Sequence, residues 1–223
     1  MRLFQQLATS ISNTISKINI PTVSIEEKEQ LEESYKKWGE LGWPVLPNAP
    51  FNFYDEFPDD IKTANAIAMK YCNTKSMDEL FDVLCQQQIK TSDLESAIFC
   101  YKNKQYKACA LVLFCLINSK IIKIQSKSKK RSVGLNAVNK LKSQLEAKTS
   151  QEHFFMTALY NINLMTCLDT YFAKGGGFRK EPNTINRNFI DHGMNIRAVR
   201  KRDCAQLFLA LHNLLEFLDE LLF

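Results

Sequence analysis

The stretch Ser92–Ile124 decides the fold, and it reads SDLESAIFCYKNKQYKACALVLFCLINSKIIKI. Apolar residues in its second half recur at steps of three and four, namely Tyr106, Ala110, Leu113, Ile117 and Ile121. This spacing is the period of an α-helix with one buried face. A polar run at Asn103–Gln105 interrupts the pattern. The stretch therefore predicts a helical hairpin, from Ser92 to about Lys102 and from Tyr106 to about Ile124.

Helix signals continue on both sides of this hairpin. Four serine or threonine residues are followed three positions later by glutamate, as in capping boxes: Ser24 with Glu27, Ser76 with Glu79, Ser92 with Glu95, and Thr149 with Glu152. With only 7 glycines and 6 prolines, the chain has few turn signals for a strand-rich fold. We expect an all-α fold, with further helices at about 4–18, 59–72, 76–88, 149–174 and 196–222.

Between Trp38 and Pro58 the helical pattern breaks. Three prolines lie within a few residues of two tryptophans and two phenylalanines. Prolines at this density exclude a helix, and large rings gain free energy when they are buried. We predict an ordered loop, anchored by its aromatic rings, at about 38–58.

Composition limits the class of protein. A chain of 223 residues with 45% hydrophobic residues can bury a sizeable core. The net charge of +5 is compatible with a nucleic-acid partner without requiring one. The 7 cysteines include no CxxC pair and lie mostly in apolar runs, as Cys109 and Cys115 do, so we expect buried free thiols rather than zinc ligands or disulfides. No run approaches the length of a membrane helix, and we expect a cytoplasmic protein with no membrane contact, metal or cofactor.

The last predicted helix is apolar on more than one face. One stripe contains Leu207, Leu211, Leu214, Leu218 and Leu221, and a second contains Phe208, Leu215 and Leu222. Either deep burial or a helix shared between the core and a subunit interface explains two stripes. The second explanation predicts a homodimer.

Two basic clusters are candidates for RNA binding through backbone phosphates. The first is Lys129, Lys130 and Arg131, in a lysine-rich stretch that otherwise reads as a solvated loop, and the second is Arg197, Arg200, Lys201 and Arg202. Asp203 follows the second cluster, and we expect it to form a local ion pair with Arg200. The alternative for the second cluster is an exposed first turn of the last helix.

The run Asn186–Gly193, which reads NRNFIDHG, carries the candidate chemistry. His192, one of 3 histidines, can transfer a proton near neutral pH, and Arg187 holds a fixed charge that suits phosphate. We expect a helix of about two turns that begins with Asn183 or Thr184 as its N-cap and ends at Gly193. Asn188 would share a face with His192 and orient its imidazole.

In an ideal helix, Arg187 and His192 lie roughly 140° apart. Either the arginine swings round, or the two residues meet across a two-fold axis. With a second copy, His192 and Arg187 would suffice for metal-free cleavage of RNA by its own 2′-hydroxyl. Asp191 is either an orienting carboxylate or a solvated acid. The triple glycine at 175–177 ends the preceding helix and is expected to form a mobile lead-in.

The motif resembles that of the HEPN superfamily ribonucleases: Arg187-Asn188 followed by His192-Gly193, similar to the Apea-like branch. The hairpin segments Glu95–Ile98 and Tyr106–Ala110 look like the first two helices of that fold. The resemblance covers about 91–223. In related sequences a carboxylate often follows the apolar run of the second helix, whereas Asn118 stands there in this chain, and an amide holds an arginine less tightly.

The resemblance implies a HEPN-like helical bundle at 91–223, with an additional N-terminal helical region at 1–90. It further implies a homodimer whose two motifs line one cleft, with Arg187 and His192 catalytic and Asn188 supporting. Many relatives act as toxins or in antiviral abortive infection, which would call for a neutralising antitoxin or a regulatory partner. The alternative is a non-catalytic RNA-binding or protein-interaction HEPN module.

Overall fold

The computed structural model describes residues 24–125, 130–146 and 155–222. The chain divides into two compact units, Met1–Gln30 and Leu31–Phe223. In the first unit, the described residues form the start of helix α2 (Ile25–Glu40). Its capping box is confirmed, since Ser24 N donates to Glu27 Oε2 at 2.8 Å and Glu27 N donates to Ser24 Oγ at 3.2 Å.

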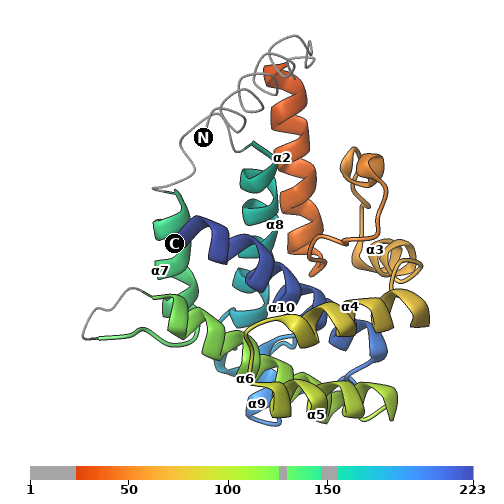
Figure 1. Cartoon of the computed structure of the whole chain (residues 1–223), viewed down its shortest axis with the longest axis vertical. Helices are drawn as coiled ribbons and strands as arrows, with labels where there is room; N and C mark the ends of the chain where they lie inside the picture. Colours follow the sequence, from red (N-terminus) through yellow and green to blue (C-terminus); the bar gives the residue numbers. More distant parts are fainter. Residues whose placement is uncertain (1–23, 126–129, 147–154, 223) are drawn as a thin grey trace, which may run out of the picture. The chain divides into compact units, whose positions relative to one another are not determined.

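The second unit contains the end of α2 and the remaining described elements, all of which are helical (Figure 1). These are η1 (Phe51–Tyr54), α3 (Ile61–Ala68), α4 (Thr74–Gln86), α5 (Thr91–Lys102), α6 (Tyr106–Ile124), α7 (Leu135–Glu146), α8 (Phe155–Phe172), η3 (Gly176–Phe178), α9 (Arg187–Asp191) and α10 (Lys201–Leu222). The predicted all-α class is confirmed over the described residues, which include no strand.

The predicted hairpin is α5 followed by α6, joined by the turn at 103–105. Its helices pack against each other, and α6 also packs against α10 (Figure 1). The other face of α10 packs against α8, and α9 is held against α6 and α8. Four of the five residues of the predicted stripe of α6, Ala110, Leu113, Ile117 and Ile121, are buried, and Tyr106 is half-buried. The helix also buries residues outside the stripe, namely Cys109, Phe114, Leu116 and Ile124.

Both apolar stripes of α10 are buried within the chain as far as their side chains are described. The described members of the two stripes are all buried: Leu207, Phe208, Leu211, Leu214 and Leu215. Each fully buried side chain of this size contributes about 1.5–3 kcal/mol relative to exposure. Deep burial therefore explains the two stripes. The side chains of Leu218, Leu221 and Leu222 lie outside the described residues.

Aromatic rings anchor the loop after α2, as predicted. Trp38, at the end of α2, and Trp43 and Tyr54 beyond it, are all buried. Trp43 Nε1 donates to Asn65 Oδ1 at 3.0 Å, and Tyr54 Oη accepts from the amide of Leu46 at 2.7 Å. The polar atoms of these buried rings therefore keep hydrogen-bond partners, as buried polar groups generally do.

Polar side chains of α8 and α10 hold the backbone of the same segment. Asn163 Nδ2 donates to the carbonyls of Tyr35 at 2.9 Å and Trp43 at 3.0 Å, and Asn213 Nδ2 donates to that of Val45 at 3.1 Å. Tyr171 Oη donates to the carbonyl of Gly42 at 2.7 Å. Residues before and after the expected boundary at 90 therefore share one unit, and the division into 1–90 and 91–223 remains a prediction.

Gly39 is the close-packing point between α2 and α8. A Cβ added there would lie 2.8 Å from both the carbonyl oxygen of Asn163 and Cβ of Thr166. Neither atom is the free end of a flexible side chain, so a larger residue would push the two helices apart. The glycine allows Tyr35 and Trp38 to reach the core beside α8.

Several predicted boundaries are wrong for identifiable reasons. Helix α4 begins at Thr74 because Asn73 caps it by accepting from Ser76 N at 3.1 Å, while Ser76 Oγ donates to the carbonyl of Tyr71. Helix α5 begins at Thr91 with no side-chain cap, so Ser92 and Glu95 form no capping box. The box at Thr149 and Glu152 and the stripe at 4–18 lie outside the described residues.

The final helix begins at Lys201 rather than Ile196. Asp203 Oδ2 accepts from the amide of Arg200 at 2.7 Å and thereby caps the helix from inside its first turn. The cysteines also differ in part from expectation. All seven are free and four are buried, but Cys115 and Cys85 are exposed and Cys100 is half-buried.

Candidate functional site

Helix α9 presents the NRNFIDHG motif as a single short helix. Asn186 is its N-cap and accepts from the amides of Asn188 at 3.0 Å and Phe189 at 3.4 Å. The predicted start at Asn183 or Thr184 and the predicted length of about two turns are wrong, because the side chain of Asn186 takes the first amides and α9 spans only 5 residues. The predicted stop is right: Gly193 follows the C-cap His192 with a φ of 68°.

The two asparagines of the motif clip α9 onto the end of α8. Asn186 Nδ2 donates to the carbonyl of Ala173 at 3.0 Å, and Asn188 Nδ2 donates to the same carbonyl at 2.8 Å. The last carbonyls of a helix lack partners within it, so these amides satisfy an acceptor that would otherwise be left unpaired. The amide of Asn188 was expected to orient His192, but its N–H group is used at Ala173.

The guanidinium group of Arg187 contacts a carboxylate and lies near an aromatic ring. Its Nε is 2.9 Å from Asp191 Oδ2, one turn along α9, and its guanidinium carbon lies 5.9 Å from the centroid of the Phe172 ring. Both side chains of the ion pair are about one-third exposed. A Cβ added to Gly134, just before α7, would lie 3.5 Å from Arg187 Nη1. The end of the loop before α7 therefore lies beside the arginine.

Asp191, not a residue of α6, supplies the carboxylate that holds Arg187. Asn118 is on α6, which packs against α9, but its Oδ1 is buried and has no hydrogen-bond partner. The sequence contained the signal for the observed pair, since Arg and Asp four positions apart are neighbours on a helix. Asp191 is exposed, and the contact its carboxylate makes is with Arg187, so neither reading of Asp191, as a partner of His192 or as a solvated acid, is decided.

His192 is exposed at the end of α9, and an aromatic ring is its neighbour. The Phe178 ring lies 5.5 Å from the imidazole in an edge-on arrangement and also contacts Phe189 at 5.2 Å. Phe178 is placed there by the glycine run, in which Gly176 and Gly177 have φ of 54° and 72° and Phe178 N donates to the carbonyl of Gly175. The triple glycine therefore forms a tight turn that leads into Phe178, whose ring lies beside His192.

The residues of the second basic cluster differ in whether they lie close to the carboxylate of Asp203. Asp203, 1% exposed, binds Arg197 through Nη1 at 2.9 Å and Nη2 at 3.1 Å. Arg197, rather than Arg200, is thus the side chain of the predicted local ion pair. Arg202 Nε lies 3.8 Å from Asp203, and partial burial lowers the pKa of Arg202 although Asp203 opposes that shift. Arg200 is exposed, and Lys201 is half-buried at the start of α10.

Two members of the first basic cluster, Lys130 and Arg131, lie between α6 and α7. The side chain of Gln125 binds Ser132, accepting from its amide at 2.7 Å and donating to its carbonyl at 2.7 Å. Lys130 and Arg131 are exposed, while Lys129 lies outside the described residues. Residues 130–133 lead into Gly134, which lies beside the Arg187 side chain.

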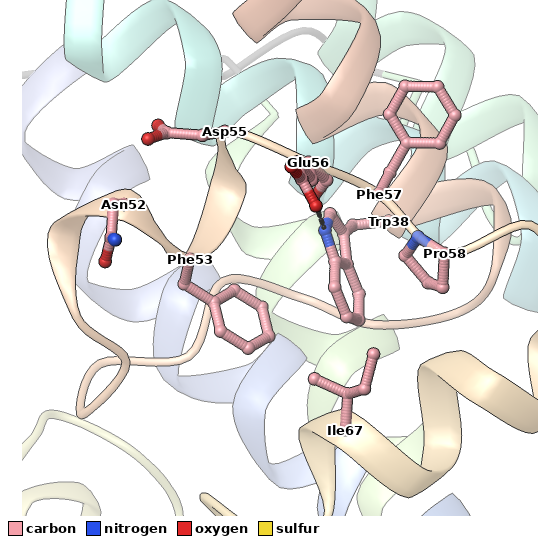
Figure 2. Close-up of a pocket in the computed structure, with 8 residues that line it drawn as sticks. All are labelled: Trp38, Asn52, Phe53, Asp55, Glu56, Phe57, Pro58 and Ile67. Carbon is pink, nitrogen blue, oxygen red and sulfur yellow. Dashed lines mark hydrogen bonds between the residues drawn. The ribbon is translucent and has the colours of Figure 1, made fainter.

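A second feature, remote from the motif in sequence, is a cavity of about 480 Å³ beside the aromatic loop. Figure 2 shows its walls, which include the rings of Trp38, Phe53 and Phe57, and the loop carrying Asp55 and Glu56. The indole N–H of Trp38 donates to the carbonyl of Glu56 at 3.1 Å and fixes that loop. The two carboxylates make this cavity unsuited to phosphate.

Over the described residues, no group of histidine, cysteine, aspartate and glutamate side chains is arranged to hold a metal ion. In the same residues, no helix has the length and apolarity needed to cross a bilayer. Comparison of the chain with protein-family models, with curated proteins and with solved structures found no match.

Proposed function

We propose that the protein is a metal-independent endoribonuclease of HEPN type, with Arg187 and His192 as its catalytic residues. The observation that carries the proposal is the anchoring of α9: the clip at Ala173 fixes a helix that bears Arg187 on one side and an exposed His192 at its end. Such an activity would serve a toxin or an effector of antiviral abortive infection.

The geometry suggests a division of labour. His192 removes the proton from a 2′-hydroxyl, whose oxygen attacks the adjacent phosphorus while the bond to the 5′-oxygen breaks. Arg187 stabilises the added negative charge after the phosphate displaces Asp191 from the guanidinium. A second His192, from another copy of the chain, protonates the leaving 5′-oxygen. The products are a 2′,3′-cyclic phosphate and a free 5′-hydroxyl.

Exposed apolar residues beside the motif support a two-copy site. Met194 and Ile196 lie two and four positions after His192 and are 47% and 89% exposed. Their segment is fixed, because Glu181 Oε2 accepts from the amides of Ile196 at 2.7 Å and Arg197 at 2.9 Å. A second copy docked over these side chains would bring another His192 to the same cleft.

The proposal is tested by cleavage of a fluorescent RNA in EDTA. The wild type should cut, and His192→Ala and Arg187→Ala should each cut about 10²–10⁴-fold more slowly. Arg179→Ala is the matched control, since Arg179 is exposed near the motif. An intact substrate with the wild type, or normal rates in both motif variants, rules out the nuclease.

The two-copy site has its own test. Ile196→Glu places a charge on an exposed side chain, so the folded chain should keep its melting temperature. Sedimentation should then show a wild-type dimer and a monomeric variant with reduced cleavage. A wild type that sediments as a monomer while cleaving RNA would contradict the shared cleft.

A second candidate function is a protein-interaction module, favoured by the aromatic cavity of Figure 2. Phe57 is 37% exposed there, and the acidic loop would suit a basic peptide. If this is the main role, Phe57→Ser should abolish capture of a partner while RNA stays uncut by the wild type. Cleavage that Phe57→Ser leaves unchanged would count against it.

A further inference from the structure

A second cavity lies where α5 ends and where α4, α6 and α10 begin. It measures about 330 Å³ and is lined by residues from the start of α4, the end of α5, the turn before α6 and the start of α10. The residues that matter for its chemistry are Thr74, Phe81, Tyr101, Lys102, Lys104 and Lys201. No continuous sequence motif contains them, because Lys201 is about a hundred positions from the other lysines.

The charge of this cavity is positive. Three lysines line it against one acid, Asp78. Lys102 Nζ lies 2.8 Å from Asp78 Oδ1, so this lysine is already paired. Among the described residues, neither Lys104 nor Lys201 has an ion-pair partner. The lining therefore keeps an excess of two positive charges.

Aromatic rings position the ammonium groups over an apolar wall. Lys201 Nζ lies 5.9 Å from the centroid of Tyr101, and Lys102 Nζ lies 5.6 Å from that of Phe81. Both rings are buried. Cation–π attraction holds each ammonium near its ring, and the low polarity of the wall strengthens the attraction of the lysines for an anion.

The N-terminal ends of two helices add to the positive electrostatic potential of the cavity. Thr74 is the first residue of α4 and Lys201 the first of α10, so amides without an acceptor in their own helices flank the cavity. The C-terminal end of α5 carries a partial negative charge, and hydrogen bonds to its last carbonyls reduce that charge. Asn103 Nδ2 and the amides of Lys104 and Gln105 donate to the carbonyls of Phe99, Tyr101 and Cys100 respectively.

We propose that this cavity binds a phosphate group, carried either by an RNA chain or by a free nucleotide. Lys104 and Lys201 provide the two open charges, and the hydroxyl and amide of Thr74 provide neutral donors. The site is separate from Arg187 and His192 in its residues, and it holds whether or not the protein cleaves RNA. Among the predicted RNA-binding residues, Lys201 is the one it uses.

The experiment measures equilibrium binding to the full chain at low ionic strength. The ligands are inorganic phosphate, AMP and a 2′-O-methyl RNA oligonucleotide, which lacks the hydroxyl needed for self-cleavage. The proteins are the wild type, Lys201→Gln, Lys104→Gln and the double variant. Lys62→Gln is the matched control, since Lys62 is exposed on α3 and outside the cavity. Melting temperatures verify that each variant is folded.

We expect saturable binding that weakens about three- to tenfold for each cavity lysine and stays unchanged for Lys62→Gln. AMP bound more tightly than the oligonucleotide would identify a free nucleotide as the ligand, and the reverse order would identify RNA. Absence of saturable binding by all three ligands overturns the proposal. Equal losses in the cavity variants and in Lys62→Gln also overturn it, because only general surface charge would then be acting.

A cleavage assay on the same variants separates this site from the nuclease. If the ligand is RNA, Lys201→Gln and Lys104→Gln should raise the KM for RNA, although neither variant changes an atom of His192 or Arg187. His192→Ala should retain full phosphate binding. Failure of the nuclease proposal would therefore leave the binding result standing, and failure of the cavity would leave cleavage intact.

Discussion

Arg187 Nε lies 2.9 Å from Asp191 Oδ2, one turn along α9. The pair places a carboxylate on the very arginine that the sequence marks for phosphate. Because both side chains are about one-third exposed, water and salt screen the attraction, and a phosphate can compete for the guanidinium. We therefore expect the pair to contribute little to the stability of the fold, and we propose that Asp191 occupies the guanidinium until a phosphate replaces it.

Replacing Asp191 by Asn should release Arg187. We expect several-fold tighter binding of 2′-O-methyl RNA and a loss of less than about 0.5 kcal/mol in the free energy of unfolding. Asp169→Asn is the control, because Asp169 forms a comparable exposed pair with Lys142 at 3.2 Å. Fluorescence anisotropy and urea denaturation measure the two quantities. Weaker RNA binding by Asp191→Asn would instead mean that Asp191 positions the arginine.

The asparagine clip predicts a structural role for Asn188. Asn188→Ala removes the 2.8 Å hydrogen bond to the carbonyl of Ala173 and should lower the free energy of unfolding by about 1 kcal/mol. Asn183→Ala, at an exposed asparagine five residues earlier, should change it little. If Asn188→Ala kept full stability and lost only cleavage, the residue would act on His192 as the sequence first indicated.

The fold was predictable where one periodic signal dominated. The stripe from Tyr106 to Ile121 gave α6 its correct length, and the polar run at Asn103–Gln105 gave the turn. Boundaries failed where a polar side chain competed for the first amides, as Asn73 does before α4 and Asp203 does within α10. Several residues near each of these starts could serve as caps, and tertiary contacts decide among them.

The candidate site was predictable only in part. The motif indicated which residues carry charge and a proton, but not that Asn188 would bind Ala173 or that the glycine turn would place Phe178 beside His192. The double stripe of α10 suggested a subunit interface, yet the members of both stripes whose side chains are described are buried within the chain. Long-range contacts of this kind leave no periodic trace in a single sequence.

The pair formed by half-buried Arg197 and buried Asp203 predicts a stability effect rather than an effect on RNA. Asp203→Asn leaves the guanidinium without its bidentate partner and weakens the cap of α10, so the free energy of unfolding should fall by about 3 kcal/mol or more. Asp82→Asn, on the exposed face of α4, should be nearly neutral. Urea denaturation decides, and equal stability of both variants would show that the pair contributes nothing net.

Alkaline pH should destabilise the protein through its buried thiols. Burial raises the pKa of Cys72 to about 12, from an ordinary value of 9.0, and burial also raises the pKa of Tyr54 and Tyr171. Above about pH 9 the unfolded chain loses the thiol proton first. It then binds fewer protons than the folded chain, so the free energy of unfolding falls as pH rises.

The contribution of Cys72 is fully present below pH 9 and is lost progressively towards pH 12, with a slope of at most about 1.4 kcal/mol per pH unit. Urea denaturation at a series of pH values should show this slope in the wild type and a shallower one in Cys72→Ala. Cys85→Ala, at an exposed thiol, should keep the wild-type slope. Identical slopes in all three proteins would mean that Cys72 ionises in the folded chain as readily as in the unfolded one.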